Sequence, residues 1–182
     1  RKYKKIDSSR ILRKNESGID LIARDERFVK LLYYKDTWYS SYGRVVEYRD
    51  GKYRVQRGSK DKRTGKRMFT LEKEKYVKPT KIFKYVKHRV SAEELAVETF
   101  IVNYDKTNNT RIWHQLNNEN DLYYKNLYPV TEKQYDRLTE LQNESVFPLS
   151  EDLIMQVINA VEYKQDGWNP AHYRRGMCGI GY

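Results

Sequence analysis

The chain has 182 residues, of which 38% are hydrophobic and 34% are charged, and its net charge is +11. This length and composition suit one medium-sized domain with a modest core. The single cysteine, Cys178, excludes an internal disulfide and a cysteine-based zinc site, and it fits a reducing compartment. No run of 18 apolar residues occurs, so the sequence predicts no membrane-spanning segment and no membrane partner of that kind.

The positive charge is concentrated in one part of the chain. Residues 51–90 carry 15 Lys and Arg against 3 Asp and Glu, whereas residues 91–182 carry 8 against 14. Such a concentration is typical of a surface that binds the phosphate backbone of a nucleic acid. An acidic protein or an anionic membrane surface is the alternative partner for a basic face of this kind.

The N-terminal part of the chain is predicted to contain an arm and the first core element. Residues 1–26 form a basic N-terminal arm, and residues 1–15 in particular are expected to order only on a partner, because they contain few apolar side chains. Residues 27–35 are apolar enough to form the first buried element. They open a basic region, 27–90, that is rich in β-forming residues.

Two hairpins are predicted within this basic region. Asp50-Gly51 separates two β-rich runs, which is a strong signal for a tight turn. A second turn, SKDKRTGKR (59–67), joins VQR to MFTLE, and residues 81–90 predict one more strand. A basic hairpin tip can follow a nucleic-acid backbone, although a solvated turn has the same composition. The residues expected to contact nucleic acid are Arg54, Arg57, Lys60, Lys62, Arg63, Lys66, Arg67, Lys87 and Arg89.

Three helix starts are marked by capping signals in the acidic half. The runs 91–94 (SAEE) and 131–134 (TEKQ) match the capping-box pattern, and Ser150 opens a third helix. Apolar residues follow each start at helical spacing and are interpreted as core. The region 145–182 comprises the third helix and an irregular tail.

Three stretches resemble the homing endonucleases of phages and mobile elements. WYSSYGRVVEY (38–48) resembles a motif of the small NUMOD4-like domain that precedes the HNH nuclease in this family, and KHRVSAEELAVETFIVN (87–103) resembles the helix that follows it. WHQLNNENDLYYKNLYPVT (113–131) resembles the HNH motif itself, with the same interval of twelve residues from His114 to Asn126. The resemblance covers about residues 30–142.

The resemblance implies a fold and a site. The fold is α+β, with small antiparallel hairpins, a ββα-metal (HNH-like) motif within residues 91–144 and C-terminal helices. His114 stands at the position of the general base and Asn126 at the position that braces the loop. The two positions that supply metal ligands in the family hold Trp113 and Tyr135, which are poor ligands for Mg²⁺. Carboxylates that could replace them by a local shift are Glu119, Asp121 and Asp136.

The sequence thus leaves three hypotheses open. The first is a nucleic-acid-binding protein with an HNH-like fold and a degenerate metal site, which needs no cofactor. The second is an active Mg²⁺-dependent HNH nicking or homing endonuclease, whose partner is DNA. The third is a phage structural protein or inhibitor that docks on a host or virion assembly through residues 145–182. The phage or mobile-element origin, and with it a place in the bacterial cytoplasm or the virion, is implied by the resemblance alone.

Overall fold

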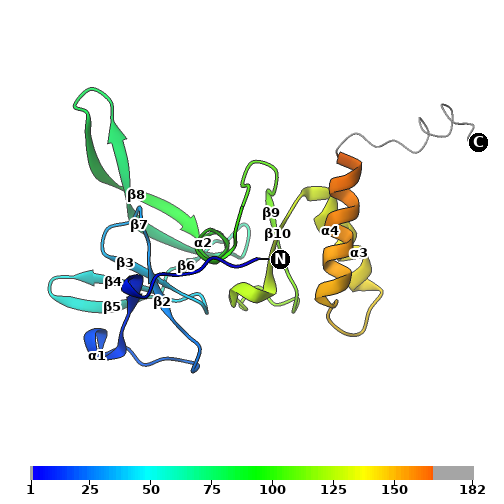
Figure 1. The fold of residues 1–182 in the computed structure, drawn as a ribbon, viewed down its shortest axis with the longest axis horizontal. Coiled ribbons are helices and arrows are strands. Elements are labelled where there is room, and N and C mark those ends of the chain that lie inside the picture. Colours follow the sequence, from blue (N-terminus) through cyan, green and yellow to red (C-terminus); the bar gives the residue numbers. More distant parts are fainter. Residues whose placement is uncertain (1, 166–182) are drawn as a thin grey trace, which may run out of the picture.

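The computed structural model describes residues 2–165 of the protein, with side chains described as far as residue 160. Within these residues the chain is a mixed α+β fold of three small antiparallel sheets and four α-helices, which confirms the predicted class (Figure 1). None of the helices described is long and apolar enough to cross a membrane.

The first sheet has five strands in the order β1-β2-β3-β4-β5. The predicted hairpin at Asp50-Gly51 is confirmed, and both residues have positive φ angles, 54° and 74°, as a two-residue turn of type I′ requires. The predicted first buried element, residues 27–35, contains β2. The strands are β1 (Ile11–Leu12), β2 (Phe28–Lys30), β3 (Thr37–Ser40), β4 (Val45–Arg49) and β5 (Lys52–Gln56).

The N-terminal residues differ from the expectation of an arm that orders only on a partner. A 3-10 turn, η1 (Ser8–Arg10), leads into β1, and α1 (Lys14–Ser17) follows. β1 pairs with β2 through Ile11↔Val29 and Leu12↔Phe28, and the backbone N–H of Lys4 donates to the carbonyl of Phe100 at 2.8 Å. Sparse apolar residues in this segment, Leu12 above all, are enough to attach it to the body of the protein.

The second sheet, β6-β7-β8, contains the longest strands. β6 (Ser59–Lys60) pairs only with the base of β7 (Arg67–Val77), whereas β7 and β8 (Ile82–Ser91) pair over their whole length. The predicted turn at residues 59–67 joins β6 to β7. It does not join β5 to β7 directly, because Gly58, with φ +67°, separates β5 from β6. The distal part of β7 and β8 projects from the body as a two-stranded ribbon (Figure 1).

The third sheet lies between two hydrophobic cores. It pairs β9 (Arg111–His114) with β10 (Leu127–Val130), which is preceded by η2 (Tyr124–Asn126). On one side lie α2 (Ala92–Phe100) and the core shared with the first two sheets, and on the other lie α3 (Glu132–Asn143) and α4 (Glu151–Gln165), as Figure 1 shows. In chain order β9, β10 and α3 are a strand, a strand and a helix, which is the order that the resemblance implies. An HNH motif also requires metal ligands, which this order alone does not provide.

The capping predictions are confirmed to different degrees. Thr131 and Gln134 form a complete capping box at the start of α3. At α2 only half of the box is present, because Ser91 accepts from the backbone of Glu94 while the Glu94 carboxylate pairs with Lys106. Ser150 accepts from the backbone N–H of Leu153 at the start of α4. The predicted irregular tail beyond residue 165 lies outside the described residues.

Candidate functional site

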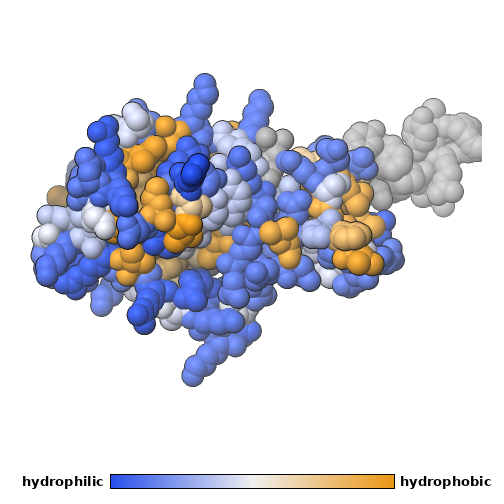
Figure 2. Space-filling view, turned by 90° about the horizontal axis from the view of Figure 1, so that it is seen from below, coloured by the Kyte–Doolittle hydropathy of each residue, from blue (hydrophilic) through white to orange (hydrophobic). Residues whose placement is uncertain are grey.

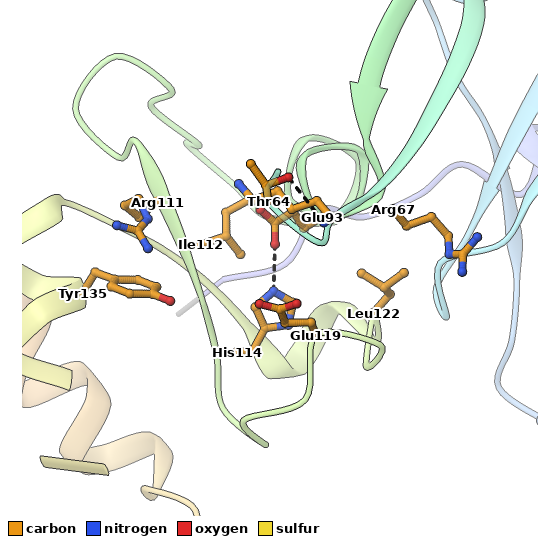
Figure 3. A pocket seen from close by; sticks show the side chains of 10 residues that line it. Thr64, Arg67, Glu93, Arg111, Ile112, His114, Glu119, Leu122 and Tyr135 are labelled. Atoms are coloured by element: carbon orange, nitrogen blue, oxygen red, sulfur yellow. Dashed lines mark hydrogen bonds and ion pairs between the residues drawn. The ribbon is translucent and has the colours of Figure 1, made fainter. Parts of the chain in front are cut away.

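A cavity of about 320 Å³ lies where the β6–β7 turn, the start of α2 and the end of β9 meet (Figure 3). His114 and Glu93 stand in its wall, and Lys66 reaches it from the turn. Tyr135 of α3 and Arg111 of β9 close one side, where the Arg111 guanidinium lies 3.7 Å from the centre of the Tyr135 ring. The sequence-predicted base therefore lies in a polar cavity.

His114, Glu93 and Lys66 form a chain of charges at this cavity. Nε2 of His114 lies 2.7 Å from Oε2 of Glu93, and Nζ of Lys66 lies 2.8 Å from Oε1 of the same carboxylate. The side chain of Glu93 is 9% exposed and that of His114 is 14% exposed, whereas Lys66 reaches solvent. A buried carboxylate between two cationic groups holds both of them in place.

The charge states follow from this geometry. Burial alone lowers the pKa of His114, but the hydrogen bond and the charge of Glu93 outweigh it, so the pKa of His114 is raised above its usual value. Burial likewise works against the charge of Glu93, and its hydrogen bonds to His114 and Lys66 hold the pKa of the carboxyl below its usual value. The pair favours a protonated imidazole beside a carboxylate, which is the opposite of a free general base.

Asn126 braces the loop between β9 and β10. Its Nδ2 donates to Oδ2 of Asp121 at 2.8 Å, and its main chain bonds to Tyr123 and Gln115 on the two sides of the loop. The second ring nitrogen of His114, Nδ1, is buried beside the main chain of Asp121 and makes no hydrogen bond of good geometry within the described residues. Asn126 thus joins the two sides of the loop that follows His114.

The side chains at the family's ligand positions do not fit a metal beside His114. Strand alternation places Trp113 and His114 on opposite faces of β9. Trp113 is buried in the core with α3 and α4, and its indole N–H meets no acceptor among the described residues. Tyr135 packs between Trp113 and Arg111, whose positive charge opposes a metal ion at that place.

The three alternative carboxylates do not complete a metal site either. Asp121 is engaged by Asn126, and the exposed Asp136 does not line the cavity. Glu119 lines the cavity, but its only acidic neighbour there is Glu93, which His114 and Lys66 already hold. Among the described residues, no three His, Cys, Asp or Glu side chains come together in a way that could hold a metal ion.

The nine residues predicted to contact nucleic acid are spread over two sheets. Lys66 and Arg67 line the cavity, although Arg67 points away from His114 and donates to the carbonyl of Arg57 (Figure 3). Lys87 and Arg89 share one face of β8, where Lys87 stands opposite Glu72 and Arg89 bonds to Asp61. The remaining exposed residues of the set are Arg54, Arg57, Lys60, Lys62 and Arg63, on β5, β6 and their turns.

The more uniform basic surface is on the other face of the ribbon, which the sequence prediction missed. In the register of β7 and β8, Lys75 stands directly opposite Lys84, and Lys73 opposite Val86, on the same face. Beyond Leu71 this face carries no acidic residue. We call it the lysine face, made of Lys73, Lys75 and Lys84; Lys78 and Lys81 lie in the turn that connects the two strands. The alternation of Lys73 and Lys75 was the available signal, and it needed the strand register to be interpreted.

Glu93 is the second residue that sequence reasoning missed. It is one of two adjacent glutamates at the helix start, and only the other, Glu94, stands at the position that a capping box uses. Its contact with His114 joins residues 21 positions apart, across two elements.

Apolar side chains remain exposed in the C-terminal half. Val146 and Phe147, in the loop between α3 and α4, are 92% and 76% exposed. Figure 2 shows apolar residues gathered over the end of the molecule that holds α3 and α4, apart from a larger patch over the sheets. This loop and α4 are the described parts of the region 145–182, which was predicted to be specific to a protein partner.

The described residues form a mixed α+β fold with a charged cavity, in which no set of metal ligands comes together, and a projecting basic ribbon. Comparison with known proteins adds no assignment, because no protein-family model, curated protein or solved structure matches the chain.

Proposed function

We propose that the protein binds nucleic acid through the lysine face of the β7–β8 ribbon, and that the region around His114 serves as a scaffold rather than as a metal-dependent nuclease. The observation that supports binding is the sorting of charge on the ribbon. One face holds Lys73, Lys75 and Lys84 without an acid beyond Leu71, whereas the opposite face mixes acidic, basic and aromatic residues.

The pair Lys75 and Lys84 is the sharpest sign of a binding role. Like charges directly opposite each other in an antiparallel pair destabilise the sheet. Both side chains are exposed, so neither is required for packing. A polyanion on this face removes the repulsion and forms phosphate contacts with both lysines. Binding therefore gives a reason for a pairing that lowers the stability of the sheet.

The scaffold role of the other region follows from its contacts. His114 is held by Glu93 and Asn126 is held by Asp121, so the loop and helix α2 are joined to the β6–β7 turn at the base of the ribbon. Such a junction fixes where the ribbon projects. Because binding is mainly electrostatic, its affinity falls steeply with salt, and the phosphate contacts by themselves read no base sequence.

The test is a salt titration of duplex binding by fluorescence anisotropy. The double variant Lys75→Gln/Lys84→Gln is expected to bind roughly tenfold more weakly and to lower the slope of log K against log salt by about two. The matched control is Lys133→Gln/Arg137→Gln, which removes the same charge from α3 and leaves binding unchanged. Equal losses in both variants would show that only net charge matters and would overturn the assignment of this face.

A second candidate function is phosphodiester cleavage at the cavity. The observation in its favour is that His114 and Glu93 lie among the cationic groups of Lys66 and Arg111, a set that can hold a phosphate. Cleavage that depends on Mg²⁺ or Mn²⁺ and is lost in His114→Ala would establish it. The scaffold proposal predicts no cleavage by either protein.

A further inference from the structure

A second and larger groove, of about 710 Å³, lies on the other side of α2 from the cavity at His114. Its apolar wall includes Leu31 and Leu95, which are buried, and Leu32, which is 65% exposed. Three tyrosines line it as well: Tyr33, which is 63% exposed, and the more buried Tyr34 and Tyr104. The groove thus offers aromatic and apolar surface that the protein itself leaves partly open.

The rim of this groove is positively charged. Lys4, Arg10, Lys73 and Lys106 line it, and each comes from a different segment of the chain. The only acid among the lining residues is Glu98, whose pKa is raised above its usual value by burial and by the charge of Glu94. Lys106 is paired with the carboxylate of Glu94, which leaves the charges of Lys4, Arg10 and Lys73 around the aromatic wall to match an anion that carries rings.

The groove is continuous with the lysine face. Lys73 belongs to both, since it stands on the lysine face and its ammonium lies 5.7 Å from the centre of the Tyr34 ring at the groove wall. His88, on the same face of β8, also packs against Tyr34, with 6.3 Å between the ring centres. A strand whose phosphates follow Lys84, Lys75 and Lys73 therefore arrives at the groove.

We propose that this groove receives an unpaired nucleotide of a single-stranded segment, with its base against Tyr33 and its phosphates among the cations of the rim. The inference rests on the proposed binding of nucleic acid to the lysine face, and it adds that the preferred substrate has a single strand next to a duplex. Stacking of a base on an aromatic side chain tolerates any base, so the site reads the absence of pairing rather than a sequence.

Charge and layout favour a nucleic acid over an acidic peptide. A peptide that fills the groove needs carboxylates that meet cations on separate segments of the chain while its backbone crosses the open side. A nucleotide strand carries one phosphate for each base, and the shared residue Lys73 lets one polyanion occupy both the lysine face and the groove. Tyrosines in the wall supply flat rings on which a base can stack, whereas the aliphatic side chains of a peptide would cover these rings only in part.

The experiment compares a blunt duplex with the same duplex carrying a single-stranded extension, using the full chain. The extension contains 2-aminopurine, whose fluorescence is quenched when it stacks. The wild-type protein is expected to bind the extended probe more tightly and to quench the signal. Tyr33→Ala is expected to lower affinity for the extended probe by roughly fivefold to a hundredfold and to leave the blunt duplex unchanged, whereas Tyr33→Phe retains both properties.

Tyr48→Ala is the matched control, because Tyr48 is also an exposed tyrosine, at 42%, but lies on β4 away from the groove. If neither probe binds at low salt, the proposed function itself fails. If both probes bind equally and Tyr33→Ala behaves as wild type, binding stands and the groove assignment is overturned. Binding of a Glu- and Leu-rich peptide that requires Tyr33, without any preference for the extended probe, would assign the groove to a protein partner instead.

Discussion

Replacing Glu93 with glutamine removes the negative charge that lies between His114 and Lys66 while it keeps the size of the side chain. Loss of one partner from a buried ion pair costs about 3–5 kcal/mol. Here Lys66 is 42% exposed and is solvated by water once released, and the glutamine oxygen still accepts one hydrogen bond. We therefore expect the free energy of unfolding to fall by about 2 kcal/mol near pH 5.5. For a chain of this size this lowers Tm by about 4–8 °C.

The pH dependence gives this prediction its specificity. The pKa of His114 is raised in the folded protein, so its stabilisation is complete below the unfolded value of 6.5 and is lost as the pH rises through the folded value. The pKa of Glu93 is lowered, so its stabilisation is present above 4.5 and is lost as the pH falls through the folded value. The ion pair contributes most between these two limits. Above the folded pKa of His114 only a hydrogen bond to a neutral imidazole remains, so the cost of the substitution is about 1 kcal/mol smaller at alkaline pH than near pH 5.5.

Urea unfolding of the wild type and Glu93→Gln, at pH 5.5 and pH 8, measures both quantities. In the variant the carboxylate no longer offsets burial, so the pKa of His114 falls and the stability of the variant rises with pH where that of the wild type declines. Glu132→Gln is the control, because it breaks the exposed pair with Arg111 and is expected to cost less than about 1 kcal/mol at both pH values. A cost for Glu93→Gln that is the same at both pH values, or larger at pH 8, would refute the charged pair.

Three further outcomes are expected. Asn126→Ala removes the side-chain bond to Asp121 and should cost about 1 kcal/mol, with faster proteolysis of the β9–β10 loop as the readout; protection equal to that of the wild type would contradict the bracing role. Lys84→Glu replaces a like-charge pair with an opposite-charge pair, so thermal unfolding should show a gain of a few tenths of a kcal/mol while anisotropy shows weaker binding of a duplex; a fall in both would contradict the opposed placement of Lys75 and Lys84. Thr131→Ala should cost about 1 kcal/mol in urea unfolding through loss of the helix cap, and a neutral result would mean that the capping box does not hold α3.

Local signals in the sequence predicted the elements well, because each depends on a few neighbouring residues. The turn at Asp50-Gly51 requires positive φ at two successive positions, which these residues tolerate. Thr131 and Gln134 satisfy each other's backbone N–H groups at the start of α3 without a distant partner. The turn at residues 59–67 was predicted too, but its partner strand was not, since the break at Gly58 moves β6 to another sheet. The order of strands and the attachment of the N-terminal segment to β2 depend on packing between distant residues, which no local pattern contains.

The site was predictable in part for the same reason. The motif placed His114 and Asn126 at the end of β9 and before β10, where the structure has them. The sequence already argued against a metal ligand at Trp113, because its side chain is a poor ligand for Mg²⁺, and the structure adds that it lies on the opposite face of β9 from His114. The partner of His114 was not predictable, because Glu93 belongs to another helix and no spacing rule connects them. The lysine face likewise needed the pairing of Lys75 with Lys84, which only the register provides.

The most direct test of the central claim is one gel that reports binding and cleavage together. Supercoiled plasmid is incubated at low salt with the wild-type protein, with His114→Ala and with Lys75→Gln/Lys84→Gln, each in the presence of Mg²⁺, Mn²⁺ or a chelator. We predict that the wild type and His114→Ala retard the plasmid equally with or without metal, that the lysine variant retards it less, and that no nicked product forms. Metal-dependent nicking that His114→Ala abolishes would contradict the account, and so would a plasmid that runs free with the wild-type protein.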